Sequence, residues 1–174
     1  MRLAVRAASV ILAGIALLGP SVSFSQFTAS LEDRVKANYL VRFAAFVEWP
    51  PTAFASSTAP MLICVAGSDP FGAALDRAAE GQTAQSRPIA VRRPRSASEA
   101  EPCHILYAAV GTRPAFRTPV HGRLLVTEAG DGGMIAFRLR DARVRFDVDL
   151  AAARRSGLSL NSRLLDLAVT VRGR

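Results

Sequence analysis

A helix that stops at two prolines constrains the fold of this chain more than any other feature. Residues 35–54 read VKANYLVRFAAFVEWPPTAF, and Pro50 both ends a helix and moves the preceding residue out of helical geometry. Ser30 is a suitable N-cap upstream. Apolar residues repeat at helical spacing and predict one buried face: Leu31, Val35, Tyr39, Phe43, Phe46 and Val47. The sequence therefore predicts a helix that docks on a hydrophobic core.

The start of the chain has the composition of a signal peptide. A basic start is followed by an apolar run, residues 7–18, that is too short to span a bilayer comfortably. We expect cleavage after Ser25, so that residues 1–25 are removed and residues 26–174 are exported to the periplasm as one domain. An uncleaved N-terminal anchor is the alternative.

The charge of the chain excludes some partners and leaves others open. Its formal net charge of +8 falls to +6 without Arg2 and Arg6. The basic residues are almost all arginine and are not interleaved with aromatic residues, and export also argues against nucleic acid as a partner. An acidic protein surface or anionic lipid headgroups remain candidates.

The two cysteines, Cys64 and Cys103, both lie in the exported region. An oxidising compartment favours a disulfide between them, and two buried thiols are the alternative. Their spacing excludes a redox-active CxxC site.

Short apolar runs separated by helical stretches predict repeated βα units and a largely parallel sheet. Between the first two runs, Asp69 is placed to cap a helix whose first position is Pro70. The predicted strands are residues 61–65, 89–91, 104–108 and 124–127.

The pattern changes after Gly130. Apolar and polar residues alternate over residues 135–139 and again over residues 144–150, with Asp141 and Ala142 as a two-residue connection. This predicts an antiparallel hairpin with one buried face. A short helix is expected over residues 151–155, and residues 162–168 are expected to form either a final helix or a packed tail. The fold class is thus α/β, with a largely parallel sheet plus a C-terminal antiparallel hairpin.

Several segments in order carry a family resemblance. They are FVEWP, LICVAGSDPFGAAL, CHIL, LLVTEAG, GGMIAF, ARVRFDVDLAAARRSGL and NSRLLDLA, and together they span nearly the whole exported region. In this order and spacing they resemble the YfiR-like family of periplasmic repressors of membrane-bound diguanylate cyclases. The resemblance implies a three-layer α/β sandwich held by a disulfide between Cys64 and Cys103.

The resemblance also implies the partners. The main one is the periplasmic sensor domain of an inner-membrane diguanylate cyclase, whose cyclic-di-GMP synthesis the exported protein restrains. Two further candidates are an outer-membrane-associated sequestering protein and a second copy of the chain, as a homodimer. Some members of the family carry a second cysteine pair, which this chain lacks, so redox control through that pair is not expected here.

The residues offer little for catalysis. A Cys103–His104 pair is disfavoured because adjacent residues of a strand point to opposite faces. The segment GSDPFG after the first strand lacks the spacing of a phosphate-binding loop, and capping by Asp69 explains it better than a bound anion. Neither a nucleophile motif nor clustered metal ligands occur, so no enzyme activity and no cofactor are expected.

Four arginines are the first candidate binding residues. A two-residue connection places Arg140 opposite Arg143 and Arg138 opposite Arg145, and directly opposed like charges are destabilising. Asp147 and Asp149 on the same face are one source of compensation. The alternative is a surface that recognises an acidic partner or a small anionic ligand.

Trp49, with Phe46 and Phe54, is the second candidate group. Trp49 is the only tryptophan of the chain. It either covers the edge of the core or serves as an exposed anchor in an interface, where tryptophan is enriched.

The sequence thus favours a non-catalytic periplasmic regulator that represses a diguanylate cyclase by binding its sensor domain. The alternative is a periplasmic small-molecule-binding protein that feeds a sensor or a transporter.

Overall fold

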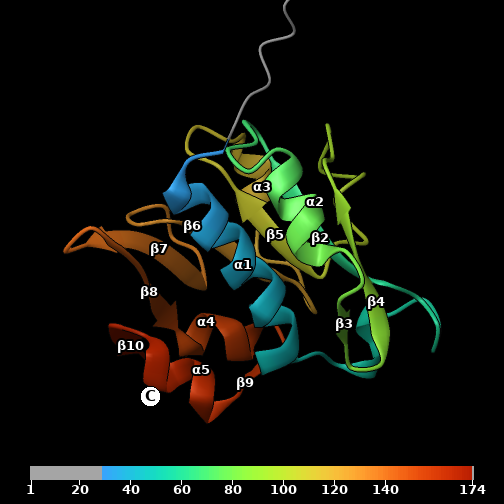
Figure 1. Cartoon of the computed structure of the whole chain (residues 1–174). Helices are drawn as coiled ribbons and strands as arrows, with labels where there is room; N and C mark the ends of the chain where they lie inside the picture. Colours follow the sequence, from blue (N-terminus) through green and yellow to red (C-terminus); the bar gives the residue numbers. More distant parts are fainter. Residues whose placement is uncertain (1–28, 174) are drawn as a thin grey trace, which may run out of the picture.

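The short apolar runs form a mostly parallel eight-stranded sheet in the computed structural model, which describes residues 29–173 (Figure 1). The predicted signal peptide, residues 1–25, lies outside the described residues. The strand order is β10-β8-β7-β6-β5-β2-β4-β3. Four neighbouring strands are parallel: β2 (Met61–Ala66), β4 (Arg87–Arg92), β5 (Ile105–Ala108) and β6 (Leu124–Glu128).

The outer strands complete the sheet. β7 (Ile135–Arg140) is parallel to β6 and forms the predicted antiparallel hairpin with β8 (Arg143–Asp149). Short strands flank both ends, namely β3 (Thr83–Ala84) beside β4 and β10 (Thr170–Arg172) beside β8. A separate antiparallel pair joins β1 (Val47–Glu48) to β9 (Ser159–Leu160).

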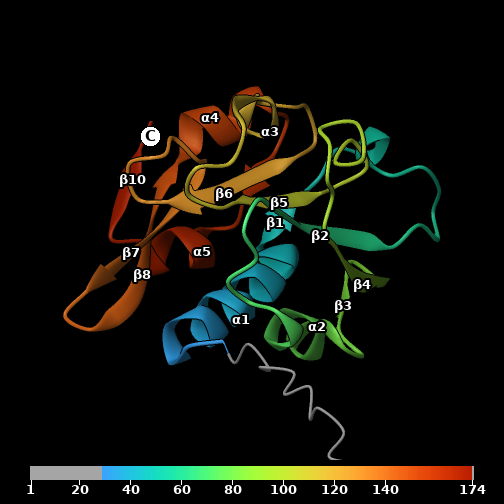
Figure 2. The same ribbon diagram turned by 90° about the horizontal axis from the view of Figure 1, so that it is seen from above.

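Helices cover both faces of the sheet, as Figure 2 shows. On one face α1 (Leu31–Phe46) lies beside α2 (Ala73–Ala79) and contacts α5 (Ser162–Leu167). The opposite face carries α3 (Pro114–Arg117) and α4 (Leu150–Arg155). A short 3-10 turn, η1 (Pro51–Ala53), follows β1. The expected three-layer α/β fold is therefore confirmed.

The first helix begins where the sequence predicts but buries a different face. Ser30 is the N-cap and forms a capping box with Asp33, whose backbone N–H donates to the Ser30 hydroxyl at 3.1 Å. Leu31 and Val35, expected to be buried, are 70% and 36% exposed. The buried face instead includes Lys36, because its ammonium forms ion pairs with Glu32 on α1 and with Glu128 at the end of β6.

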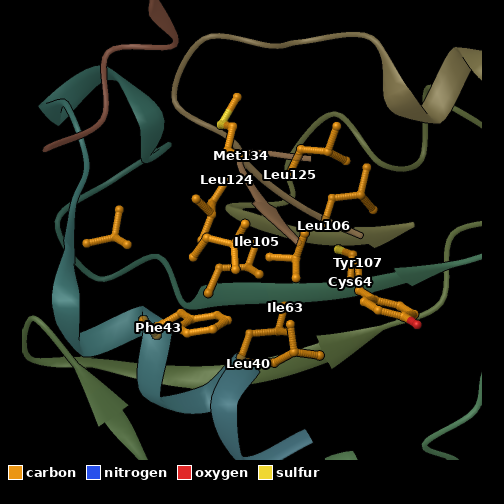
Figure 3. Packing of buried hydrophobic residues seen from close by; sticks show 14 of the residues in the cluster. Leu40, Phe43, Ile63, Cys64, Ile105, Leu106, Tyr107, Leu124, Leu125 and Met134 are labelled. Atoms are coloured by element: carbon orange, nitrogen blue, oxygen red, sulfur yellow. The ribbon is translucent and has the colours of Figure 1, made fainter. Parts of the chain in front are cut away.

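The inner face of α1 packs on the hairpin. Tyr39 and Phe43 lie against Phe137 of β7 and Phe146 of β8, with ring centroids 5.3–6.1 Å apart. Figure 3 shows Leu40 and Phe43 over the central strands, where Ile63 and Ile105 are fully buried. The helix is therefore held by aromatic contacts at the hairpin and by aliphatic contacts over β2 and β5.

Two other boundaries differ from the sequence-based expectation. The Asp69 carboxylate accepts hydrogen bonds from the backbone N–H groups of Phe71 and Gly72, at 2.8 and 3.1 Å, so it shapes a turn, while α2 itself begins at Ala73. At the C-terminal end the predicted helix is present as α5, but Thr170 to Arg172 then returns to the sheet as β10, which the sequence pattern did not indicate.

Candidate functional site

The predicted disulfide between Cys64 and Cys103 is present and joins β2 to the segment that leads into β5. The two Cα atoms are 5.9 Å apart, and both residues are buried. His104 follows directly, so Cys103 is bonded to Cys64 and is not available as a nucleophile for that histidine. The cysteine pair therefore has a structural role.

His104 fixes the segment that follows the two prolines. Its Nδ1 accepts a hydrogen bond from the Leu62 backbone N–H at 3.0 Å, and its Nε2 lies 3.0 Å from the Ala53 carbonyl oxygen. These partners require the neutral ring with a proton on Nε2. Burial lowers the pKa of His104, and the nearby Arg87 charge lowers it further, while the bond to Ala53 acts in the opposite direction.

The aromatic candidates surround this histidine. Trp49 is only 8% exposed, and its indole N–H donates to the His104 carbonyl oxygen at 3.4 Å. Trp49 therefore covers the core and is not an exposed anchor in this structure. Phe54 stacks on the His104 ring at 4.3 Å and lies under the Arg87 guanidinium at 3.8 Å, while Phe46 is partly buried against the core. The expected shared aromatic patch is thus largely internal.

The β7–β8 hairpin projects from the body of the molecule (Figure 1). Asp141 and Ala142 have φ values of 50° and 53°, which is the geometry of a type I′ turn. The register pairs Arg138 with Arg145 and Arg140 with Arg143, as the sequence predicts.

The four hairpin arginines differ in their partners. Arg138 is paired with the buried Asp147, with Nη2 and Oδ2 at 2.6 Å, and Arg140 lies 3.9 Å from Asp141. Within residues 29–173, no acidic group lies within ion-pair distance of Arg143 or Arg145. Aspartates of the hairpin therefore neutralise the arginine charges only in part. Asp149 does not contribute, because its carboxylate caps α4.

The hairpin and α1 also carry exposed apolar side chains. Leu139 shares the face of Phe137 but lies nearer the hairpin tip, and it is 58% exposed. Along α1, Val35 and Tyr39 line a groove of about 390 Å³ with Asn38 and Arg42. Because successive residues of a strand point to opposite faces, Leu139 lies on the face of the hairpin that packs on α1, and the four arginines lie on the other face.

Two ion-pair clusters were not found from the sequence. Glu128 accepts hydrogen bonds from Lys36 at 2.8 Å and from the Tyr107 hydroxyl at 2.7 Å. Burial raises the pKa of Tyr107, and the Glu128 carboxylate raises it further. Burial alone would lower the pKa of Lys36, but the hydrogen bonds to Glu128 and Glu32 outweigh it and raise it. The cluster ties α1 to β5 and β6.

The second cluster is centred on Arg93. Its guanidinium contacts Asp69 at 2.8 Å and Asp76 at 2.7 Å, and it also donates to the Gly72 carbonyl oxygen. The hydrogen bond from Arg93 lowers the pKa of Asp76. Both clusters join residues more than 15 positions apart, so no local pattern would have indicated them.

No group of three or more His, Cys, Asp or Glu side chains that could hold a metal ion occurs within residues 29–173. In the same part of the chain, no helix has both the length and the apolar character needed to cross a membrane.

Comparison with known proteins gives one family. A family model described as YfiR/HmsC-like matches residues 33–169, which is most of the chain. A search of curated proteins finds no match.

Proposed function

Because the chain belongs to the YfiR/HmsC-like family, we propose that it is an exported, non-catalytic regulator that binds the periplasmic sensor domain of an inner-membrane diguanylate cyclase and represses cyclic-di-GMP synthesis. The match covers every helix and strand from α1 to α5 apart from the first two residues of α1, so the proposal concerns the whole domain. The periplasmic location is part of this proposal and is supported by the disulfide.

The observation that carries the binding part of the proposal is the pair of arginines at the hairpin tip. Arg143 and Arg145 have no acidic partner within the described residues. An arginine without an internal partner is available to a carboxylate on another protein, which its planar guanidinium binds through two hydrogen bonds. The opposite face of the same hairpin carries the exposed Leu139, which offers a partner an additional apolar contact. We therefore assign the hairpin to an acidic patch of the sensor domain.

Repression would follow from selective binding. A regulator that binds one conformation of the sensor domain more tightly than the others shifts the population toward that conformation. If the cytoplasmic cyclase domains are separated or misaligned in that state, synthesis falls without any chemical step in the regulator.

Charge reversal at the hairpin tests the proposal. The variant Arg143→Glu/Arg145→Glu should lose at least tenfold of its affinity for the purified sensor domain, because two favourable contacts become repulsive. The matched control is Arg163→Glu, an exposed arginine on α5 that is remote in sequence from the hairpin. Affinity unchanged in the hairpin variant, with its circular dichroism spectrum preserved, would refute the assignment of this surface.

A genetic test addresses the repression itself. Deletion of the gene should raise cyclic-di-GMP, and the cyclase should co-purify with the regulator from envelope extracts. Cyclic-di-GMP that stays level on deletion would argue strongly against repression.

The alternative function is that of a periplasmic small-molecule-binding protein that feeds a sensor or a transporter. A crevice on the molecule, described below, favours ligand binding. A neighbouring gene for a membrane protein with a periplasmic sensor and a cytoplasmic cyclase domain would favour the regulator. The sequestering protein and the homodimer also remain candidate partners.

A further inference from the structure

A crevice of about 550 Å³ opens at the carboxyl ends of the parallel strands β2, β4 and β5. The chain runs from β2 to β4 on one side and then returns to β5 on the other side of β2. The strand order therefore reverses between β2 and β5. In open α/β sheets, ligands bind in the crevice outside the carboxyl ends of the strands at such a reversal.

The loops that follow the three strands form the walls. Gly67 follows β2 and has a φ of +86°, and a Cβ atom at this position would collide with the Thr112 hydroxyl. That hydroxyl lies 3.0 Å from the Ala66 carbonyl oxygen and 2.6 Å from the Ala109 carbonyl oxygen. The Thr112 side chain thus joins the ends of β2 and β5 beside the crevice, through hydrogen bonds to two backbone carbonyl groups.

Three arginines line the crevice, but only one of them is neutralised. Arg93 is held by Asp69 and Asp76. The guanidinium groups of Arg95 and Arg113 are exposed, and no carboxylate within residues 29–173 lies within ion-pair distance of either. Two uncompensated cations that converge on one crevice from different loops favour an anionic ligand.

Other parts of the lining are apolar. Phe116, Val65 and Pro94 are buried residues that line the crevice. A volume of this size is within the range of about 300–1,000 Å³ that is usual for small-molecule sites. A bare inorganic ion would leave this apolar surface without a contact, whereas a small organic anion uses both the apolar residues and the arginines.

We propose that this crevice binds a small organic anion, with its carboxylate or phosphate group on Arg95 and Arg113 and its apolar part against Phe116 and Val65. The site is distinct in sequence from the hairpin to which the partner is assigned. Its existence does not depend on the identity of that partner.

The test uses the full exported chain and four probes: phenyl phosphate, benzoate, inorganic phosphate and the neutral benzyl alcohol. Titration calorimetry gives the affinity, and amide chemical shifts of Gly67 and Gly111 report where each probe binds. We expect phenyl phosphate or benzoate to shift these amides and to bind more tightly than inorganic phosphate. Benzyl alcohol should bind at least tenfold more weakly. A preference between the two organic anions identifies the anionic group.

Variants complete the test. Arg95→Ala/Arg113→Ala should weaken binding of the better organic anion at least tenfold, while Arg163→Ala should leave it unchanged. Arg113→Lys, which keeps the charge but loses the planar fork, should lie between them and serves if the double variant does not fold. The proposal is overturned if no organic anion shifts Gly67 or Gly111, if the shifts map to the hairpin, if inorganic phosphate or benzyl alcohol binds equally well, or if the arginine variants bind like the wild type.

Discussion

Arginine side chains gather in two regions of the molecule, around the crevice beside β2 and along the β7–β8 hairpin. In both, one arginine close to the sheet is held by carboxylates: Arg93 by Asp69 and Asp76, and Arg138 by Asp147. In both, other arginines have no acidic partner within residues 29–173, namely Arg95 and Arg113 at the crevice and Arg143 and Arg145 on the hairpin. The surroundings differ, because a disulfide joins β2 to the start of β5, whereas the hairpin projects from the body and ends in a two-residue turn.

This difference separates two kinds of recognition. A crevice whose walls are joined by the Thr112 hydroxyl suits a ligand of defined size. A projecting hairpin with free arginines and an exposed leucine suits a protein surface, which can close around it. In each region the paired arginine stabilises the scaffold and the unpaired ones are available for binding.

Loss of the disulfide should have the largest effect on stability. The variant Cys64→Ala/Cys103→Ala should lower the free energy of unfolding by about 4 kcal/mol on the chain-entropy argument, given a sequence separation of 39 residues. Urea unfolding followed by circular dichroism measures this, with the reduced wild-type chain as the control. Equal stability of the oxidised and reduced wild type would show that the crevice half does not depend on the bond.

Truncating a side chain at the base of the hairpin should destabilise the protein far more than truncating one near its tip. Phe137 is fully buried against Phe43 and Phe146, so Phe137→Ala should destabilise the protein by about 3 kcal/mol or more. Leu139→Ala, on the same strand face but exposed, should change stability by less than about 0.5 kcal/mol. Leu139→Ala should instead lower affinity for the sensor domain. Equal destabilisation by both variants would mean that the tip is part of the core.

Paired and unpaired arginines should also differ in their contribution to the free energy of unfolding. Arg93→Ala should lower the free energy of unfolding by about 1 kcal/mol, because its ion pairs are partly exposed and screened by solvent. Arg143→Ala should be neutral within about 0.5 kcal/mol. Thermal unfolding of the two variants beside the wild type measures the contrast. If Arg93→Ala left the free energy of unfolding unchanged, paired and unpaired arginines would not differ in their contribution to stability.

A pH dependence centred on His104 should be the smallest effect. Burial lowers its folded-state pKa below the ordinary value of 6.5. Between these two values the unfolded chain binds a proton that the folded chain does not, so the free energy of unfolding should fall as pH decreases below 6.5. Melting temperatures measured from pH 7.5 to pH 5 should show this fall in the wild type. They should show a weaker fall in His104→Gln than in the wild type.

The parts of the fold that follow a local rule could be predicted from the sequence. Alternation of apolar residues and a two-residue connection were enough to place Arg138 opposite Arg145. Continuous apolar runs were enough to find the buried parallel strands. Strands of two or three residues, such as β9 and β10, have no pattern of their own and arise only from pairing with a neighbour.

The parts that depend on distant partners could not be predicted. Lys36 is buried because the carboxylate of Glu128, 92 positions later, accepts hydrogen bonds from its ammonium group, and this rotates Leu31 and Val35 toward the solvent. The sequence pattern did not predict the crevice because Arg95 and Arg113 lie in separate loops. The predicted parallel strands could have indicated it, because the loops that follow parallel strands meet at one edge of the sheet.

The register of the C-terminal strand has a consequence for self-association. β10 pairs only with Asp147 to Asp149, so within the described residues the outer edge of β8 from Arg143 to Arg145 has no strand beside it. An unprotected strand edge is a template on which copies of a protein aggregate. Here a second copy aligned edge to edge would bring guanidinium against guanidinium. The same charges that invite an acidic partner therefore keep identical chains from extending one another's sheets at high concentration.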